Sequence, residues 1–278
     1  MNNTNTKIIK IHGKNIETFF QNIITNDINN LNADNPIYTA MLSPQGKYLY
    51  DFFILKEKNF FLLEVNTNTI NSLIAEIKKY DIRNDILIKS QENFYTKVIV
   101  KENLIKGYLE KINKKKVFRE ESFLFFSDPR SKDFLYRFWF NKTSTSLLNF
   151  SNDEEVEKKR ILNIIPNSEL DLIYNKSFIL NYNFENINAL SFDKGCYIGQ
   201  ENTARQKFRG TQKYSLKSIK IISGTIPDLN EDIFYKKVKV GTMKSKCNDI
   251  GLCLIRKDLT QDNAGHLKTD KNCILKIL

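Results

Sequence analysis

The last quarter of the chain alternates short apolar runs with turns, and this pattern constrains the fold most. Four runs beyond Gly210 have the length of β-strands: SLKSIKII, KKVKVGTMKS, IGLCLI and CILKIL. Turn segments such as IPDLNED separate them. Strands at this short spacing are typical of a small barrel or sandwich. We therefore predict two domains, residues 1–209 and residues 210–278, the second a small β-barrel or sandwich.

The first domain mixes helix and strand patterns. Apolar residues between Ile16 and Ile24 recur at intervals of three and four, which predicts an amphipathic helix. Residues 37–65, IYTAMLSPQGKYLYDFFILKEKNFFLLEV, predict three strands with a Pro-Gln-Gly turn between the first two. A second helix is expected from Asn68. These segments together predict an α+β fold.

Another helix is expected over SNDEEVEKKRILNIIP, residues 151–166. Ser151 or Asn152 would cap its N-terminus, acidic residues occupy the first turn, and Pro166 would end it. Pro129 separates two further strand-like runs in SFLFFSDPRSKDFLYRFWF.

Composition excludes several classes of protein. The 43 basic residues outnumber the 32 acidic ones, but the excess is lysine scattered along the chain, so we favour a solvated surface over a nucleic-acid footprint. The four cysteines and two histidines lack the spacing of a metal site. The N-terminal residues have no apolar leader, and no run reaches the roughly 18 apolar residues of a membrane span. We expect a cytoplasmic protein without a protein-held metal or a membrane partner.

The segment FDKGCYIGQENTARQKFRG, residues 192–210, has the strongest functional pattern. Gly195 and Gly199 flank Cys196, and glycine is needed where φ is positive or another group comes close. We predict a tight loop that presents Cys196 and a helix that begins at Gln200. A thiol just before a helix, among basic residues such as Lys194, is expected to ionise more readily than a free cysteine.

These residues also have purely structural interpretations. Free cysteines are among the most buried residue types, although the glycines around Cys196 favour a functional thiol. Neither histidine is expected near Cys196, which argues against a protease nucleophile. Gln200 and Glu201 could bind a ligand or simply occupy the exposed first turn of a helix, where the helix dipole favours an acid.

Three arginines are candidate anion ligands. Arg160 shares a helix face with Val156 and Ile164, so its guanidinium is drawn toward the interior and needs a carboxylate or phosphate partner. A structural ion pair and a ligand contact both satisfy that need. Arg130 and Arg137 flank a strand turn and leave the same two alternatives open.

Asp51 places a carboxylate in the otherwise apolar strand YLYDFFIL. A charge in such a strand is costly unless it is paired or used in function. Asp51 is therefore a candidate site residue, with a strand edge as the structural alternative.

Six blocks together resemble the YgfZ family of folate-binding relatives of the glycine cleavage T-protein, which includes a mitochondrial iron-sulfur assembly factor. The blocks are FFQNIITNDI, MLSPQGKYLYDFFIL, DPRSKDFLYRFWF, RILNIIPNSELDL, FDKGCYIGQENTARQKFRG and GTMKSKCNDIGLCLI. They follow the family's order and cover the chain from about residue 8 to its end. KGCYIGQE is the most specific of them.

The resemblance implies a T-protein-like cloverleaf of α/β subdomains around a folate-sized hole, closed by the C-terminal β-barrel. It further implies tetrahydrofolate binding and a role in making or repairing iron-sulfur proteins, including enzymes that thiolate tRNA.

The resemblance also assigns roles by position. Catalytic roles fall on Cys196, in the signature, and on Asp51, near the T-protein's catalytic aspartate. A folate contact falls on Arg160, and Lys194, Tyr197, Gln200 and Glu201 match the signature. Together with the two open candidates Arg130 and Arg137, these residues are the predicted folate contacts. The chain departs from the family where Ile164 and Ile165 precede Pro166 in place of a glycine, and where Phe134 and its neighbours replace the glycine after the DPR block.

Three hypotheses of function follow. The first is a folate-dependent accessory factor with iron-sulfur client proteins, in which Cys196 is a redox-active group or a transient ligand. The second is an enzyme, the aminomethyltransferase of glycine cleavage. The third is a basic RNA-binding protein, although the chain lacks the interleaved aromatic and basic residues of an RNA-binding sheet. We expect an accessory factor rather than an enzyme.

Overall fold

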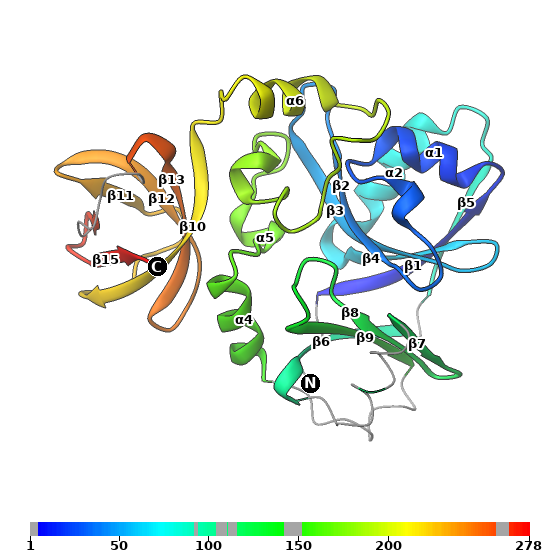
Figure 1. Ribbon diagram of the computed structural model, residues 1–278, viewed down its shortest axis with the longest axis horizontal. Helices are drawn as coiled ribbons and strands as arrows, with labels where there is room; N and C mark the ends of the chain where they lie inside the picture. The colour runs from blue at the N-terminus through cyan, green and yellow to red at the C-terminus, as the bar shows by residue number, and fades with distance from the viewer. Residues whose placement is uncertain (1–4, 92–93, 104–109, 111–115, 142–151, 260–266) are drawn as a thin grey trace. The chain divides into compact units, whose positions relative to one another are not determined.

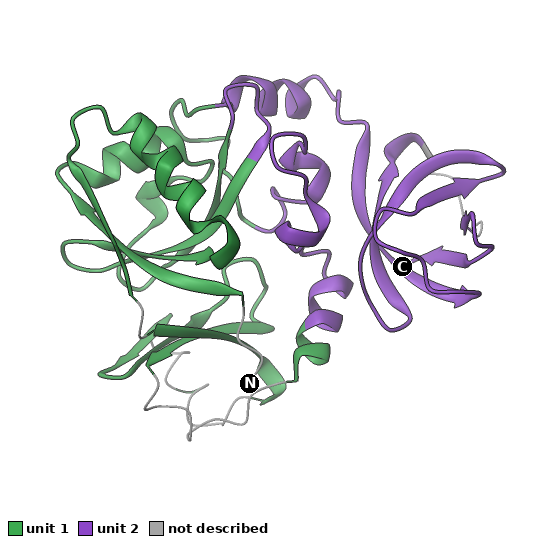
Figure 2. Cartoon of the chain, turned by 180° about the vertical axis from the view of Figure 1, so that it is seen from behind, with its two compact units in different colours: residues 1–42, 49–156, 188–198 green, residues 43–48, 157–187, 199–278 purple. Residues whose placement is uncertain are grey.

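The structure is a computed structural model that describes residues 5–91, 94–103, 110, 116–141, 152–259 and 267–278 (Figure 1). The chain forms two compact units, which Figure 2 distinguishes by colour. Unit 1 contains residues 1–42, 49–156 and 188–198, and unit 2 contains residues 43–48, 157–187 and 199–278. Each unit therefore takes more than one segment of the chain, and a domain boundary at residue 210 stays a prediction.

Unit 1 contains a five-stranded sheet in the order β2-β3-β4-β1-β5. Its strands are β1 (Thr6–Gly13), β2 (Ile37–Leu42), β3 (Tyr48–Lys56), β4 (Phe61–Asn66) and β5 (Ile86–Ser90). Strand β1 lies between β4 and β5 and pairs antiparallel with both, and β3 pairs antiparallel with β4. Two helices pack against this sheet: α1 (Ile16–Ile23) and α2 (Ile70–Tyr80) (Figure 1).

The apolar faces of α1 and α2 join the sheet in one core. Phe20 and Ile23 of α1 and Leu73 and Ile77 of α2 are buried with apolar residues of β1 to β5. This burial explains why the three- and four-residue spacing of apolar side chains indicates helices here. The helix predicted from Ile16 is confirmed.

A second sheet of unit 1 has four antiparallel strands in the order β6-β9-β8-β7. They are β6 (Phe94–Val100), β7 (Val117–Glu120), β8 (Phe123–Ser127) and β9 (Leu135–Asn141). Aromatic side chains from β8 and β9 fill its core, including Phe125 and Phe138. The turn between these two strands contains the DPR block.

Unit 2 contains three α-helices among the described residues and a closed barrel. The helices are α4 (Asp153–Leu162, whose first residues belong to unit 1), α5 (Ser168–Asp171) and α6 (Gln200–Phe208). The barrel order is β10-β13-β12-β11-β14-β15. Its strands are β10 (Tyr214–Ser223), β11 (Asp232–Tyr235), β12 (Val238–Cys247), β13 (Ile250–Arg256), β14 (Leu267–Thr269) and β15 (Ile274–Ile277). The predicted C-terminal β-barrel is confirmed.

The described residues also form short 3-10 helices: η1 (Ile28–Asn30), η2 (Thr67–Thr69), η3 (Lys101–Asn103), η5 (Ile179–Tyr182) and η6 (Lys257–Leu259). The predicted second helix accordingly begins as the 3-10 turn η2 and becomes the α-helix α2.

The helix α4 ends earlier than Pro166 predicts. Asn152 caps it, since its Oδ1 accepts the Glu155 N–H at 2.7 Å, while Ser151 lies outside the described residues. Ile164 has φ of 54°, a left-handed conformation that breaks the helix before the proline. The local backbone, rather than Pro166, therefore ends the helix.

Candidate functional site

Lys194 anchors the loop that contains Cys196, here called the cysteine loop (residues 192–199), to the end of helix α1. Its Nζ donates to the carbonyl oxygens of Gln21, Ile24 and Asn26 at 2.7, 2.7 and 2.8 Å. These carbonyls belong to the last turn of α1 and the residues after it, where the helix leaves acceptors unsatisfied. Burial lowers the pKa of Lys194 to about 8, and Asp27 opposes that shift. All three ammonium hydrogens therefore serve a structural purpose within unit 1.

Two further contacts fix the loop on either side of the thiol. The Ile198 N–H donates to the Asn22 carbonyl at 3.1 Å, and the Ser191 N–H donates to the Thr25 carbonyl at 3.0 Å. Cys196 lies between these anchors and is exposed. A loop tied down at both ends holds its central residue in a restricted position. The thiol is thus presented to solvent on an ordered segment.

Alkylation is expected to modify Cys196 first. Cys247 is half-buried, while Cys253 and Cys273 are fully buried in the barrel core. Burial raises the pKa of both core thiols, so they offer little thiolate at neutral pH. Brief treatment of the native chain with iodoacetamide, followed by peptide mass analysis, should find label on Cys196 before the other three. Faster labelling of either core cysteine would contradict this.

The two glycines that flank Cys196, Gly195 and Gly199, differ in backbone conformation. Gly199 has φ of 82° and forms the N-cap of α6, as the predicted loop requires. Gly195 is not among the residues with positive φ, and a Cβ built there meets nothing within 4 Å. The expected backbone requirement is therefore confirmed for Gly199 and wrong for Gly195.

The Pro-Gln-Gly turn packs against the start of α6 within unit 2. Asn202 Nδ2 donates to the Gln45 carbonyl at 2.8 Å. Gly46 has φ of 74°, and a Cβ on it would lie 2.9 Å from the Asn202 Cβ and 3.0 Å from the Gly199 carbonyl oxygen. The turn thus positions the helix that follows the cysteine loop in the sequence.

Gly46→Ala is expected to lower the free energy of unfolding by about 1–3 kcal/mol, because it combines left-handed backbone strain with a steric clash. Gly210→Ala is the matched control: its φ of 62° is also left-handed, but a Cβ there meets nothing within 4 Å. Urea denaturation of both variants measures the difference. Equal losses in the two would show that the contact with α6 is unimportant.

The remaining signature residues follow Cys196 in the sequence. Tyr197 is 6% exposed, and the Lys194 Nζ lies 5.0 Å from its ring centroid. Gln200 is the first residue of α6, and Glu201 is exposed and forms an ion pair with Arg205 at 2.6 Å. The helix start at Gln200 is confirmed. Folate contacts by these residues stay predictions.

Asp51 lies within a group of aromatic and charged side chains in unit 1. Tyr38 of β2 donates its hydroxyl hydrogen to Asp51 Oδ2. The Arg130 guanidinium lies 4.9 Å from the Tyr38 ring centroid and 4.8 Å from that of Phe53. Arg130 also forms an ion pair with Asp128 at 2.9 Å. The half-buried carboxylate of Asp51 is therefore held in an ordered polar group.

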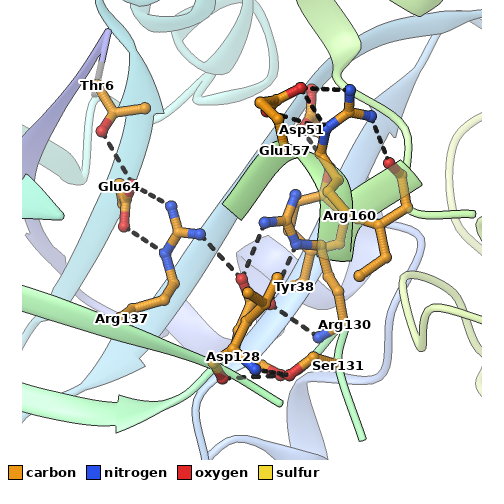
Figure 3. Close-up of polar contacts among 12 residues, drawn as sticks. Thr6, Tyr38, Asp51, Glu64, Asp128, Arg130, Ser131, Arg137, Glu157 and Arg160 are labelled. Atoms are coloured by element: carbon orange, nitrogen blue, oxygen red, sulfur yellow. Dashed lines mark hydrogen bonds and ion pairs between the residues drawn. The ribbon is translucent and has the colours of Figure 1, made fainter. Parts of the chain in front are cut away.

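Arg137 joins the two sheets of unit 1 through buried ion pairs, which Figure 3 shows. Its Nε lies 2.8 Å from Glu64 Oε2, and its Nη1 lies 3.0 Å from Asp128 Oδ2. Glu64 also accepts hydrogen bonds from Trp139 Nε1 at 2.6 Å and from Thr6 Oγ1 at 2.9 Å. Arg137 therefore compensates two carboxylates that are removed from water.

Burial and neighbouring charges together shift the pKa values of Asp128 and Tyr38 in this cluster. Burial alone would raise the pKa of Asp128, but Arg130 and Arg137 lower it to about 2. Burial raises the pKa of Tyr38 well above its usual value, and the nearby charge of Asp51 adds to that rise. Tyr38 thus stays a neutral hydrogen-bond donor to Asp51.

Arg160 forms a comparable cluster within unit 2. Its guanidinium donates to Glu157 Oε2, the Ile165 carbonyl and Ser245 Oγ, each at 2.7 Å. Asp171 Oδ2 lies 3.5 Å from its Nη1 and is fully buried. Asp171 in turn accepts from the Ser245 N–H at 2.6 Å. Arg160 therefore joins α4 and α5 to barrel strand β12, and its predicted folate contact stays a prediction.

The structure brings Asp51, Arg130 and Arg137 into one cluster. Sequence reasoning missed Glu64 and Asp128, which neutralise the arginines. Glu64 carries the same signal as Asp51, a single acid in an apolar strand, FLLEVN.

Across the described ranges, no group of three or more His, Cys, Asp or Glu side chains is arranged to hold a metal ion. Within those same ranges, no helix is long and apolar enough to cross a bilayer.

No family model matches the chain. The chain is nevertheless similar to the mitochondrial iron-sulfur cluster assembly factor IBA57 homolog of Neurospora crassa, with 29% identity over 257 residues, 82% of this chain and 55% of that protein. It is also similar to the tRNA-modifying protein YgfZ of Blochmanniella pennsylvanica, with 23% identity over 286 residues, 92% of this chain and 82% of that protein. The resemblance to the YgfZ family is confirmed.

Coverage differs among the YgfZ-family relatives. The chain spans little more than half of the IBA57 homologues of Neurospora crassa and Mycosarcoma maydis, 55% and 57% of their lengths. Among solved structures, the glycine cleavage aminomethyltransferase T of Bartonella henselae matches with a TM-score of 0.70 and 11% identity, over 98% of this chain and 82% of that one. This match confirms the T-protein-like fold.

The chemistry of the residues fits one end of a folate better than the other. A pterin ring carries N–H donors, and the Asp51 carboxylate is an acceptor held in place by the Tyr38 hydroxyl. The anionic tail needs a cation, but Arg130, Arg137 and Arg160 are all engaged by internal carboxylates. Asp51 is therefore the best-placed candidate for a pterin contact.

Proposed function

We propose that this chain is a cytosolic, folate-binding accessory protein for the assembly or repair of iron-sulfur proteins, including enzymes that modify tRNA. The names of its relatives support this: one is an iron-sulfur cluster assembly factor and another a tRNA-modifying protein. The observation that carries the proposal is the anchored loop, which holds the exposed Cys196 between backbone contacts on both sides.

In this proposal the loop residues have a structural role and a chemical role. Lys194 and Ile198 fix the backbone to α1, and Cys196 supplies the reactive sulfur. Cysteine thiolate is the usual protein ligand of iron-sulfur clusters. Because Cys196 is exposed, its sulfur can reach iron in a client protein without unfolding of the loop.

Folate binding is the second part of the proposal. When bound, tetrahydrofolate supplies one-carbon carrier chemistry. Asp51 would accept hydrogen bonds from the pterin, and Tyr38 would orient that carboxylate. Tyr197, which belongs to unit 1 as Asp51 does, is proposed to contribute a further contact.

Genetic complementation tests the proposed function. The full chain is expressed in a bacterial strain that lacks its own YgfZ-type protein, and the activity of an iron-sulfur enzyme that thiolates tRNA is measured. Restored activity is expected. Failure to restore it, with the chain present in soluble form, would contradict a role in iron-sulfur proteins.

The fold match to an aminomethyltransferase supports a second candidate function. An assay with lipoyl-bound aminomethyl donor and tetrahydrofolate would detect methylenetetrahydrofolate if the chain were such an enzyme. We expect little turnover. Turnover comparable to that of a T-protein, abolished in Asp51→Asn, would replace the accessory role with an enzymatic one.

A further inference from the structure

Unit 2 contains a cavity of about 440 Å³ that the proposed function does not use. Its walls come from η5 and the residues after it, and from the segment that runs from α6 to the start of β10. Ile164 and one residue of η6 also line it. Its volume falls within the range of about 300–1,000 Å³ that small-ligand sites occupy. The cavity therefore has room for a small metabolite.

Side-chain amides make the cavity wall strongly polar. Asn181, Asn183, Asn186, Gln206 and Gln212 all line it. Several of these amides are already ordered by the protein: Asn183 Nδ2 donates to the Ile164 carbonyl at 2.8 Å, and Gln212 Nε2 donates to the Leu180 carbonyl at 2.8 Å. Gln212 Nε2 also donates to the Tyr214 carbonyl at 3.0 Å, so both of its hydrogens are used, and the other amides supply the donors and acceptors for a ligand. Such a lining suits a ligand rich in hydroxyl groups.

One wall residue lacks a hydrogen bond that it needs. The Asn181 Oδ1 is buried and has no hydrogen-bond donor among the residues that the structure describes. A buried acceptor without a donor is destabilising. A ligand that donates an O–H or N–H to this oxygen would supply the missing hydrogen bond.

Positive charge in the wall exceeds negative charge. Lys207, Lys217 and Lys257 line the cavity with a single carboxylate, Glu185, which forms an ion pair with Lys207. Lys257 donates to the Gln212 side chain at 2.6 Å. For Lys217 the described part of the chain provides no ion pair. The cavity is therefore suited to an anion.

Backbone strain lies at the same wall. Ile164, which lines the cavity, has φ of 54°, and it is the only β-branched residue with positive φ in the described residues. Such a conformation is unfavourable for isoleucine and persists where surrounding contacts hold it. The Asn183 amide bonded to its carbonyl is one of those contacts.

From these observations we infer that the cavity binds a sugar phosphate. Lysines would pair with the phosphate, and the amides would bind the sugar hydroxyls, with Asn181 Oδ1 accepting one of them. Among the described residues no aromatic side chain lines the cavity, so these residues give a nucleobase no stacking surface. A free sugar phosphate therefore suits the site better than a nucleotide.

Isothermal titration of the full chain with ribose 5-phosphate and glucose 6-phosphate tests the inference. At least one is expected to bind with one-to-one stoichiometry. Ribose, inorganic phosphate and AMP are the comparison probes, and each should bind more weakly than the better sugar phosphate. Absence of binding by both sugar phosphates, or equal binding of inorganic phosphate alone, would overturn the inference.

Two variants locate the site. Lys217→Ala and Asn181→Leu should each weaken binding about tenfold or more, because each removes one polar contact. Lys220→Ala is the matched control on the same strand β10, since Lys220 lies 3.7 Å from Asp249 and outside the cavity lining. Thermal melting establishes that each variant is folded. Affinity unchanged in both cavity variants would place any binding elsewhere and contradict the assignment.

Discussion

Arg137→Met is expected to lower the free energy of unfolding by about 3–5 kcal/mol, because it leaves two buried carboxylates without their shared cation. Glu64 and Asp128 are 2% and 0% exposed, and the Arg137 guanidinium contacts both. Methionine keeps much of the side-chain volume but cannot donate hydrogen bonds. Since a domain is usually stable by only about 5–15 kcal/mol, the loss should be evident in urea denaturation.

Arg119→Met is the matched control for this variant. Arg119 lies on β7 of the same sheet and pairs with Asp34 and Glu57 in contact with solvent, at 3.4 and 3.2 Å. Pairs of this kind contribute about 0–1 kcal/mol. If Arg137→Met cost no more than Arg119→Met, the buried cluster would not be the element that joins the two sheets of unit 1.

The same cluster predicts how stability depends on pH. The folded-state pKa of Asp128 is about 2, below the value near 4 expected in the unfolded chain. Its contribution to stability is therefore present above pH 4 and is lost as the pH falls through 2. Removal of Arg137 should raise the pKa of Asp128, so acid unfolding of Arg137→Met should occur at a higher pH than that of the wild type.

Cys196→Ser is expected to abolish rescue of iron-sulfur enzyme activity in the complementation strain. Serine has a similar size, and the side chain is exposed, so the melting temperature should stay the same. A hydroxyl, however, is a far poorer ligand for iron and cannot take part in thiol chemistry. The loss would therefore report on the sulfur rather than on the fold.

Cys247→Ser provides the control, because Cys247 is a half-buried residue at the end of β12 and outside the loop. It should rescue as well as the wild type. Full rescue by Cys196→Ser would show that the thiol has no function, and the proposed role of the loop would then be wrong.

Local patterns in the sequence predicted the elements of the fold well. The spacing of Phe20 and Ile23 identifies α1 because both side chains lie on the helix face that is buried in the core. The Pro-Gln-Gly turn and the barrel strands are likewise encoded by neighbouring residues. The length of α4 was predicted less well, since the left-handed backbone of Ile164 has no signal in the identity of a β-branched residue.

The candidate site was predicted only in part, because its contacts join distant segments. The loop around Cys196 is visible in the sequence, yet the partners of Lys194 lie about 170 positions earlier, at the end of α1. The need of Arg160 for a carboxylate was apparent, but nothing local identifies Asp171. Hydrogen bonds and ion pairs between distant segments depend on the tertiary fold, which cannot be read from the identity of single residues.

Calorimetric titration of the full chain with tetrahydrofolate tests the central claim most directly. We expect saturable one-to-one binding, with weaker binding of p-aminobenzoylglutamate, which has the anionic tail but lacks the pterin that Asp51 is proposed to contact. Absence of any binding of tetrahydrofolate by the folded chain would contradict a folate-binding function.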